Sequence, residues 1–175
     1  MEIMLKNYLL CLCAVLLGIT GCSQSQNSDQ YPYRERDINT VKSLYKAYQT
    51  NDMKTAADLL ANNYKEFGPA IDDTTNKAET IDNNNGVYEF HSDIQYNDLE
   101  FYANDGHKGK HWVRVYGVWK VTHKETGKPI DVRYYEVFRI DEDGKIAELH
   151  TYWDTMDYWA DLGYEVTKKT EEDKN

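Results

Sequence analysis

The sequence predicts an α+β fold in which helices come first and cover one face of an antiparallel sheet. Between residues 37 and 60, apolar side chains recur at the spacing of a helix. After Asp93 the spacing changes to two, which is typical of strands that bury one face. Turns containing glycine separate these later segments at short intervals. Helices followed by hairpin-connected strands indicate one sheet with its helices on a single side.

Two helices are expected at the start of this domain. The first begins at Asp37, because an aspartate can accept hydrogen bonds from the free amides of a first helical turn. Its apolar stripe consists of Ile38, Val41, Leu44, Tyr45 and Tyr48. Asn51 and Asp52 interrupt this helix and cap a second one. The second helix carries its apolar residues on one side, namely Met53, Ala56, Ala57 and Leu60.

A short strand over residues 64–67 and a third helix follow. Gly68 and Pro69 close the strand. Asn76 and Glu79 have the spacing of a capping box, so the third helix is expected to begin there. The Asn-Asn-Asn-Gly run at residues 83–86 is expected to end or interrupt that helix.

Four strands make up the rest of the predicted domain. They cover residues 94–103, 111–123, 131–140 and the segment from residue 146 to 153. One face of the second strand is wholly apolar and is expected to pack on the core. This face carries Val113, Val115, Gly117, Trp119 and Val121. Asp143 and Gly144 form the turn into the last strand, because both residues tolerate a positive φ.

The N-terminal segment has the pattern of a bacterial lipoprotein signal. An apolar run over residues 8–20 follows Lys6 and is shorter than the ~20 residues that span a bilayer. The residues Ile19-Thr20-Gly21-Cys22 resemble the bacterial lipobox. That resemblance implies that Cys22 becomes the first mature residue and carries lipid. We therefore expect a membrane partner through this lipid, and a location in the bacterial cell envelope, facing the periplasm or the outer membrane.

These observations divide the chain into four parts. Residues 1–21 are the predicted signal peptide, and residues 22–36 are the lipidated cysteine and a flexible tether. Residues 37–164 are the predicted folded domain, and residues 165–175 are a polar tail.

Composition excludes several classes of function. The formal net charge is −10, so the chain does not attract phosphate backbones and no nucleic-acid partner is expected. Cys11 and Cys13 lie in the signal and Cys22 is consumed by lipid, which leaves no thiol for a disulfide, a metal or catalysis. His107 and His111 fall in a hairpin loop, and no metal site is predicted there. No motif for a phosphate-bearing cofactor is present, so no cofactor is expected.

The last strand carries the most informative polar pattern. Alternation places Ile146, Glu148, His150, Tyr152 and Asp154 on one face. Ala147, Leu149, Thr151 and Trp153 lie on the other. An acid, an imidazole and a phenol on one side of a strand can be solvated surface or the wall of a polar pocket.

The order of several short motifs resembles the nuclear transport factor 2-like superfamily, and within it the SnoaL-like polyketide cyclase group. The motifs extend over residues 37–164. They are Asn51-Asp52, residues 90–93, Thr126-Gly127-Lys128, residues 137–140, residues 143–146, Asp154 and Leu162-Gly163. The resemblance implies a cone, in which a strongly curved sheet wraps around the helices and leaves a pocket at its open end.

The resemblance also implies functional residues. In SnoaL-like cyclases an aspartate at the position of Asp154 is the general base, and the same strand face lines the pocket. Tyr152 and His150 are therefore expected to line it. Asp154 can equally cap a helix beginning near Thr155, and the two roles are compatible. Four strand residues span ~13 Å, so His150 is too far from Asp154 for direct contact.

Glu136 is a second candidate, because it lies in an otherwise apolar row of the third long strand. A buried acid is usually paired or functional, since burying it alone is costly. Arg114 on the adjacent strand is the expected partner, and Tyr116 on the same face as Arg114 could bind a ligand carbonyl. Related epoxide hydrolases use an acid–arginine–acid set, which Arg114 followed by Val115 and Tyr116 does not reproduce.

Three functions remain open at this point. The favoured one is binding of a small, largely apolar or aromatic molecule, because the polar set around the candidate base is incomplete and the chain has 15 tyrosines. The second is an enzyme of the isomerase, cyclase or hydratase type with Asp154 as base. The third is an interaction module that forms a homodimer or docks an envelope partner.

Overall fold

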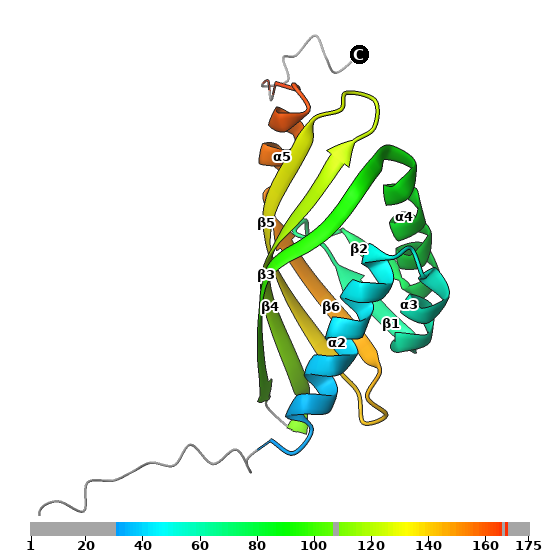
Figure 1. Ribbon diagram of the computed structural model, residues 1–175. Coiled ribbons are helices and arrows are strands. Elements are labelled where there is room, and N and C mark those ends of the chain that lie inside the picture. Colours follow the sequence, from blue (N-terminus) through cyan, green and yellow to red (C-terminus); the bar gives the residue numbers. More distant parts are fainter. Residues whose placement is uncertain (1–30, 107–108, 166, 168–175) are drawn as a thin grey trace, which may run out of the picture. The chain divides into compact units, whose positions relative to one another are not determined.

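A six-stranded mixed sheet carries the fold, and helices lie along one of its faces (Figure 1). The computed structural model describes residues 31–106, 109–165 and 167. The compact unit that these residues form begins at Tyr33. The expected signal peptide, Cys22 and residues 23–30 of the tether lie outside the described residues. No helix among those that the structure describes is long and apolar enough to cross a bilayer.

The predicted elements follow one another in the expected order, and the short strand β2 is an addition that was not predicted. The helices are α2 (Arg34–Gln49), α3 (Met53–Leu59), α4 (Lys77–Phe90) and α5 (Thr155–Asp161). The strands are β1 (Leu60–Phe67), β2 (Thr74–Asn76), β3 (His91–Asp105), β4 (His111–His123), β5 (Pro129–Ile140) and β6 (Ile146–Trp153). The order across the sheet is β2-β1-β6-β5-β4-β3. Only the β1–β6 pair is parallel among the described strands. The predicted α+β class with a curved sheet around the helices is confirmed.

The curvature of the sheet has a local cause in β3. The pairing of β3 with β4 shifts between Ser92 and Gln95, and again between Asn97 and Glu100. Asp93 and Asp98, inside these two shifts, have φ of 55° and 53°. Aspartate tolerates this left-handed conformation better than most residues, and bulges of this kind bend a strand and increase its twist. The bends let β3 fold around the helices.

The first helix begins earlier than predicted. α2 begins at Arg34 with Tyr33 in the N-cap position, so the prediction that Asp37 caps it is wrong. Asp37 is fully buried in the first turn, where its carboxylate lies 2.7 Å from Arg36 Nε and 3.4 Å from His111 Nδ1. The Asp37 carboxylate therefore links α2 to the start of β4 and does not cap the helix.

The two other predicted caps are confirmed. The Asp52 side chain accepts a hydrogen bond from the Thr55 amide at 3.0 Å at the start of α3. Asn76 and Glu79 form a complete capping box at the start of α4. Both caps involve residues within one helical turn, so the sequence alone predicts them.

The prediction that residues 83–86 end the third helix is wrong. α4 continues to Phe90. The Asn84 amide donates to the Thr80 carbonyl at 2.9 Å, and Val87 and Tyr88 pack on a core cluster beyond the asparagine run. Tertiary contacts therefore outweigh the weak helix propensity of Asn and Gly.

The core has two clusters that meet on the inner face of the sheet. The first lies beneath α2 and includes Val41, Leu44, Val113, Val115 and Phe138. The second lies nearer α4 and α5 and consists of Ile94, Val121, Ile130 and Val132. Tyr96 packs against both clusters. The apolar face of β4 is buried as predicted, and the candidate site lies where the two clusters adjoin.

Candidate ligand cavity

Strand register places Glu136 on the inner face of the sheet. Glu136 on β5 is directly opposite Val115 on β4 and Thr151 on β6. Directly opposite residues of antiparallel strands point to the same face. Val115 is fully buried in the first core cluster, so Glu136 and Thr151 must also point toward the helices.

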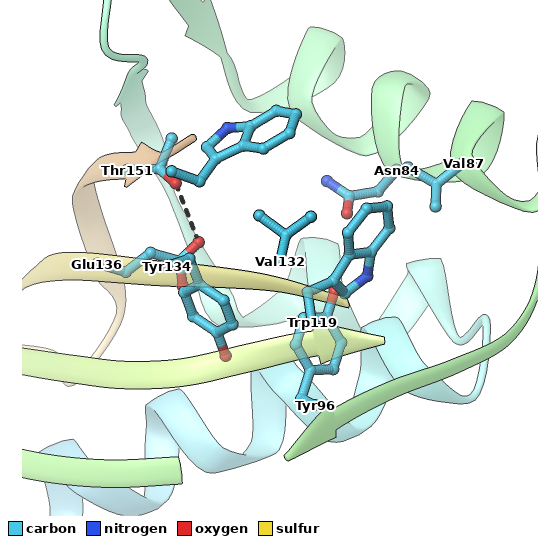
Figure 2. A pocket seen from close by; sticks show the side chains of 9 residues that line it. Asn84, Val87, Tyr96, Trp119, Val132, Tyr134, Glu136 and Thr151 are labelled. Atoms are coloured by element: carbon cyan, nitrogen blue, oxygen red, sulfur yellow. Dashed lines mark hydrogen bonds between the residues drawn. The ribbon is translucent and has the colours of Figure 1, made fainter. Parts of the chain in front are cut away.

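An open cavity of about 200 Å³ adjoins Glu136, and we call it the cone cavity (Figure 2). Asn84 and Val87 reach into it from α4, facing side chains of the sheet. The sheet contributes Tyr96, Trp119, Val132, Tyr134, Glu136, Thr151 and Trp153. Four aromatic rings and two valine side chains therefore surround one carboxyl group, one threonine hydroxyl and one amide, and two of the rings carry phenol hydroxyls.

The position of the Tyr134 side chain in the cavity wall depends on Gly117. A Cβ atom at residue 117 would lie 2.6 Å from the Tyr134 Oη atom and 2.9 Å from a Leu99 methyl group. Gly117 is directly opposite Tyr134 in the β4–β5 register. The missing side chain lets the phenol ring lie across β4 instead of standing away from it.

Glu136 is held by two hydroxyl groups from different elements. Tyr45 on α2 donates a hydrogen bond to Glu136 Oε2. Thr151 on β6 donates one to Glu136 Oε1 at 3.4 Å, as Figure 2 shows. Loss of solvent raises the pKa of Glu136 from 4.5 to about 7, although both hydrogen bonds favour the ionised form. Glu136 can therefore gain or lose a proton near neutral pH.

A smaller cavity of about 70 Å³ continues from Glu136 toward α2, and we call it the deep cavity. Asn84, Tyr96 and Glu136 line both cavities. The other residues of the deep cavity are Leu44, Tyr45, Tyr48, Glu66, Phe138 and Leu149. A second carboxyl group, Glu66 on β1, therefore shares this space with Glu136.

Glu66 is also held by hydroxyl donors. Tyr64 Oη and Thr80 Oγ1 donate to its Oε2 atom at 3.2 and 3.0 Å. Burial raises the pKa of Glu66, as it does for Glu136. The hydroxyl of Tyr48 lines the same cavity, is buried, and has no hydrogen-bond partner among the described residues. The deep cavity is thus lined by polar groups, one of which has no hydrogen-bond partner among the described residues.

Comparison with known proteins assigns this chain to a family. The sequence profile of the SnoaL-like domain matches residues 41–149. The chain belongs to the SnoaL-like domain family. A search of curated proteins found no match to the chain.

Solved structures share the fold of this SnoaL-like domain at low sequence identity. A candidate polyketide cyclase from Xanthomonas campestris is similar with a TM-score of 0.65 at 17% identity, over 74% of this chain and 98% of that one. IdmH, a candidate polyketide cyclase from Streptomyces antibioticus, has a TM-score of 0.60 at 20% identity, over 73% and 99%. An epoxide hydrolase of M. tuberculosis has a TM-score of 0.57 at 16% identity, over 75% and 92%. At such identities the likeness concerns the fold.

In this SnoaL-like domain β6 points a different face toward the helices than the resemblance predicts. Thr151 and Trp153 line the cone cavity, whereas Tyr152 and His150 do not. Tyr152 is 48% exposed and stacks on Tyr135 with ring centres 6.2 Å apart. His150 stacks on Phe67 at 4.7 Å. The prediction that Tyr152 and His150 line the pocket is wrong, because the register with β5 turns both outward.

Asp154 is a helix cap at the surface. It follows the last residue of β6, and its exposed carboxylate accepts hydrogen bonds from the Met156 and Asp157 amides at 2.9 and 3.2 Å. It lines neither the cone cavity nor the deep cavity. The capping role is confirmed, and the placement of Asp154 in the pocket as a base is corrected. The strand alternation that linked it to the pocket ends where α5 begins.

Arg114 and Tyr116 also lie on the outer face of the sheet. Arg114 is opposite Val137, not Glu136, and donates to Asn104 Oδ1 at 2.7 Å. Tyr116 is 50% exposed and its ring centre lies 4.7 Å from that of Tyr135. The expected Glu136–Arg114 pair is therefore wrong, because the two side chains point to opposite faces. Of the predicted ligand residues, only Glu136 lines the cavity.

The sequence contained partial signals for the residues that were missed. Trp119 belongs to the apolar face of β4 that was assigned to the core, and Thr151 and Trp153 belong to the other face of β6. Tyr45 lies in the predicted apolar stripe of α2. The pattern of Trp119 and Tyr45 predicts packing, and alternation places Thr151 and Trp153 only on one of two faces, because a sequence does not reveal where a core leaves a cavity.

We expect Glu136→Gln to stabilise the protein at about pH 8 and to have little effect at about pH 4. Since its pKa is raised when the chain folds, wild-type stability is full below the unfolded pKa and falls as the pH rises through about 7. The loss amounts to about 3 kcal/mol at most. Glutamine keeps the shape and avoids the charge, so the variant escapes this loss. Urea denaturation across this pH range measures the difference.

The matched control is Glu89→Gln, which removes the same charge from an exposed position of α4 outside both cavities. It should leave the pH dependence of unfolding unchanged. Wild-type and Glu136→Gln curves that run parallel across the whole pH range would show that Glu136 is not desolvated.

Proposed function

We propose that this SnoaL-like domain binds a small, largely apolar or aromatic molecule in the cone cavity. One observation carries the proposal: aromatic rings surround a single desolvated carboxyl group in an open cavity. Pockets for small molecules are mostly apolar and contain a few polar groups that fix orientation. Tyr96, Trp119, Tyr134 and Trp153 supply the apolar surface, and Glu136 supplies the anchor.

A second function is favoured by the acidity of Glu136. A carboxyl group with a pKa near 7 is suited to transfer protons at neutral pH. We propose, as the alternative, that Glu136 removes a proton from a carbon next to a ligand carbonyl, in a reaction of the isomerase or cyclase type. The hydroxyl of Tyr45 would then stabilise Glu136 in its ionised form before each transfer.

We expect protein purified from the cells that produce it to carry a small molecule that native mass spectrometry detects. Glu136→Gln should lower its occupancy at least about tenfold, because a hydrogen bond to a charged group is worth roughly 1.5–3 kcal/mol. Asp154→Asn, which alters a carboxylate outside both cavities, should retain the ligand. Equal occupancy in wild type and Glu136→Gln would contradict the binding role of Glu136.

The same preparation in D₂O separates binding from catalysis. A proton-transfer enzyme would exchange a carbon-bound hydrogen of its ligand for deuterium in wild type but not in Glu136→Gln. A ligand that binds and gains no carbon-bound deuterium in wild-type protein would exclude the enzymatic alternative for that ligand.

We also propose that the domain is anchored to the bacterial envelope by lipid on Cys22. The support is the lipobox-like Ile19-Thr20-Gly21-Cys22 sequence after a short apolar run. One lipid chain gives only marginal membrane binding, so stable anchoring requires the several chains that a lipoprotein cysteine carries. Anchoring would hold the cavity at the membrane surface, where apolar molecules concentrate.

Cys22→Ala is expected to move the protein from the membrane fraction to the soluble fraction of its cells. Cys13→Ala, in the predicted signal, is the matched control and should leave the mature protein in the membrane fraction. Fractionation followed by immunoblotting measures both, and membrane retention of Cys22→Ala would contradict the lipid anchor.

We further propose that the outer face of the sheet pairs two copies of the domain. A row of tyrosines crosses four strands there, formed by Tyr102, Tyr116, Tyr135 and Tyr152. Three of these, Tyr102, Tyr116 and Tyr152, are about half exposed at 50%, 50% and 48%. Contiguous exposed aromatic surface is typical of a protein–protein interface.

Tyr116→Arg should convert a dimer to a monomer, because it replaces an aromatic ring at the centre of this row with a long, charged side chain. Light scattering coupled to size-exclusion chromatography measures the mass. Ile71→Arg, at an apolar residue that is 98% exposed and outside the row, should leave the mass unchanged. A monomeric wild-type protein at all concentrations would refute the pairing.

A further inference from the structure

We infer that the ligand of the cone cavity is an organic cation, an amine with an apolar or aromatic body whose ammonium group is bound by Glu136. This inference rests on the proposed binding function and adds the chemical class of the ligand. It follows from the hydrogen-bonding and charge balance of the two adjoining cavities.

The first step is the kind of partner that Glu136 lacks. Both of its carboxyl oxygens already receive a hydroxyl donor, from Tyr45 and from Thr151. Each carboxylate oxygen can accept a second hydrogen bond. Because Glu136 lines the cone cavity, a ligand group there meets a hydrogen-bond acceptor and should be a donor.

The second step is the charge of the site. Glu66 and Glu136 line the same deep cavity, and the negative charge of Glu66 contributes to the raised pKa of Glu136. Among the residues that the structure describes, no lysine, arginine or histidine lines either cavity, and none forms an ion pair with Glu66 or Glu136. Two half-buried carboxyl groups without a basic partner disfavour an anionic ligand and favour a cation.

The third step is the unused polar group of the deep cavity. The Tyr48 side chain is only 8% exposed, and its hydroxyl has no hydrogen-bond partner among the described residues. A buried polar group without a partner is costly, so a ligand that supplies one gains affinity. A primary ammonium group has three N–H donors, and the side chains of Glu136 and Asn84, which line both cavities, carry acceptor oxygens. The Tyr48 hydroxyl adds an acceptor beside the deep cavity.

The fourth step is the composition of the walls. The faces of aromatic rings attract cations, and tryptophan does so most strongly. The cone cavity is lined by four aromatic side chains, Tyr96, Trp119, Tyr134 and Trp153. Figure 2 labels three of them, and no cationic side chain among the described residues competes for their faces. The same walls also accept the apolar body of the molecule. An amine therefore matches both the carboxyl group and the aromatic rings of the cone cavity.

The test compares ligands of equal shape and different charge. Isothermal titration calorimetry at neutral pH measures binding of 2-phenylethylamine and of the neutral 2-phenylethanol to the wild-type protein. We expect the amine to bind at least about tenfold more tightly, as a charge-assisted hydrogen bond does relative to a neutral one. Benzylamine and benzyl alcohol form a second matched pair with a shorter body.

Glu136→Gln should reduce the preference for the amine to less than about threefold, because the charge-assisted bond is lost. Asp154→Asn should keep the full preference, since Asp154 lies outside both cavities. Circular dichroism checks that each variant is folded. The wild-type comparison of amine with alcohol does not depend on any variant.

Two results would overturn the inference in distinguishable ways. If amine and alcohol bind with equal affinity, the ligand is not a cation, but the proposed binding function stands. If no probe of either pair binds, the inference and the proposed function both fail. An amine preference that Glu136→Gln leaves unchanged would also overturn the inference, because the ammonium group would then be held elsewhere.

Discussion

The continuous register between β4 and β5 is the constraint on which the site depends. It runs from His111 opposite Ile140 to Thr122 opposite Pro129 without a shift. Because side chains alternate along both strands, this pairing decides the face of every residue at once. It sends Glu136 inward and Arg114 outward. A slip of one residue would exchange the cavity wall for the outer tyrosine row.

Burial of Glu136 costs the domain free energy of folding. A carboxyl group removed from water costs free energy unless it is hydrogen-bonded, and Glu136 receives donors from α2 and β6 rather than a positive partner. The hydroxyl groups of Tyr45 and Thr151 thus connect a helix and two strands through one side chain. A protein selected only for stability would place an apolar residue there, so the acid indicates a function in binding or proton transfer.

The two faces of the sheet serve different purposes. On the inner face, the side chains form two core clusters and leave a cavity where they adjoin. On the outer face, Tyr116, Tyr135 and Tyr152 are directly opposite one another and form part of the exposed row. The bulges at Asp93 and Asp98 bend β3, which makes the inner face of the sheet concave.

The sequence alone determined the class of fold, the bounds of β4, the caps at Asp52 and Asn76, and the presence of an acid in the apolar row of β5. These follow from local periodicity and local hydrogen bonding. Only the tertiary structure decided that α4 continues through residues 83–86, that β6 turns Thr151 and not Tyr152 inward, and that Asp154 caps α5. Alternation defines two faces but does not say which one is covered. That choice depends on pairing with β5 and on helices that are distant in the sequence.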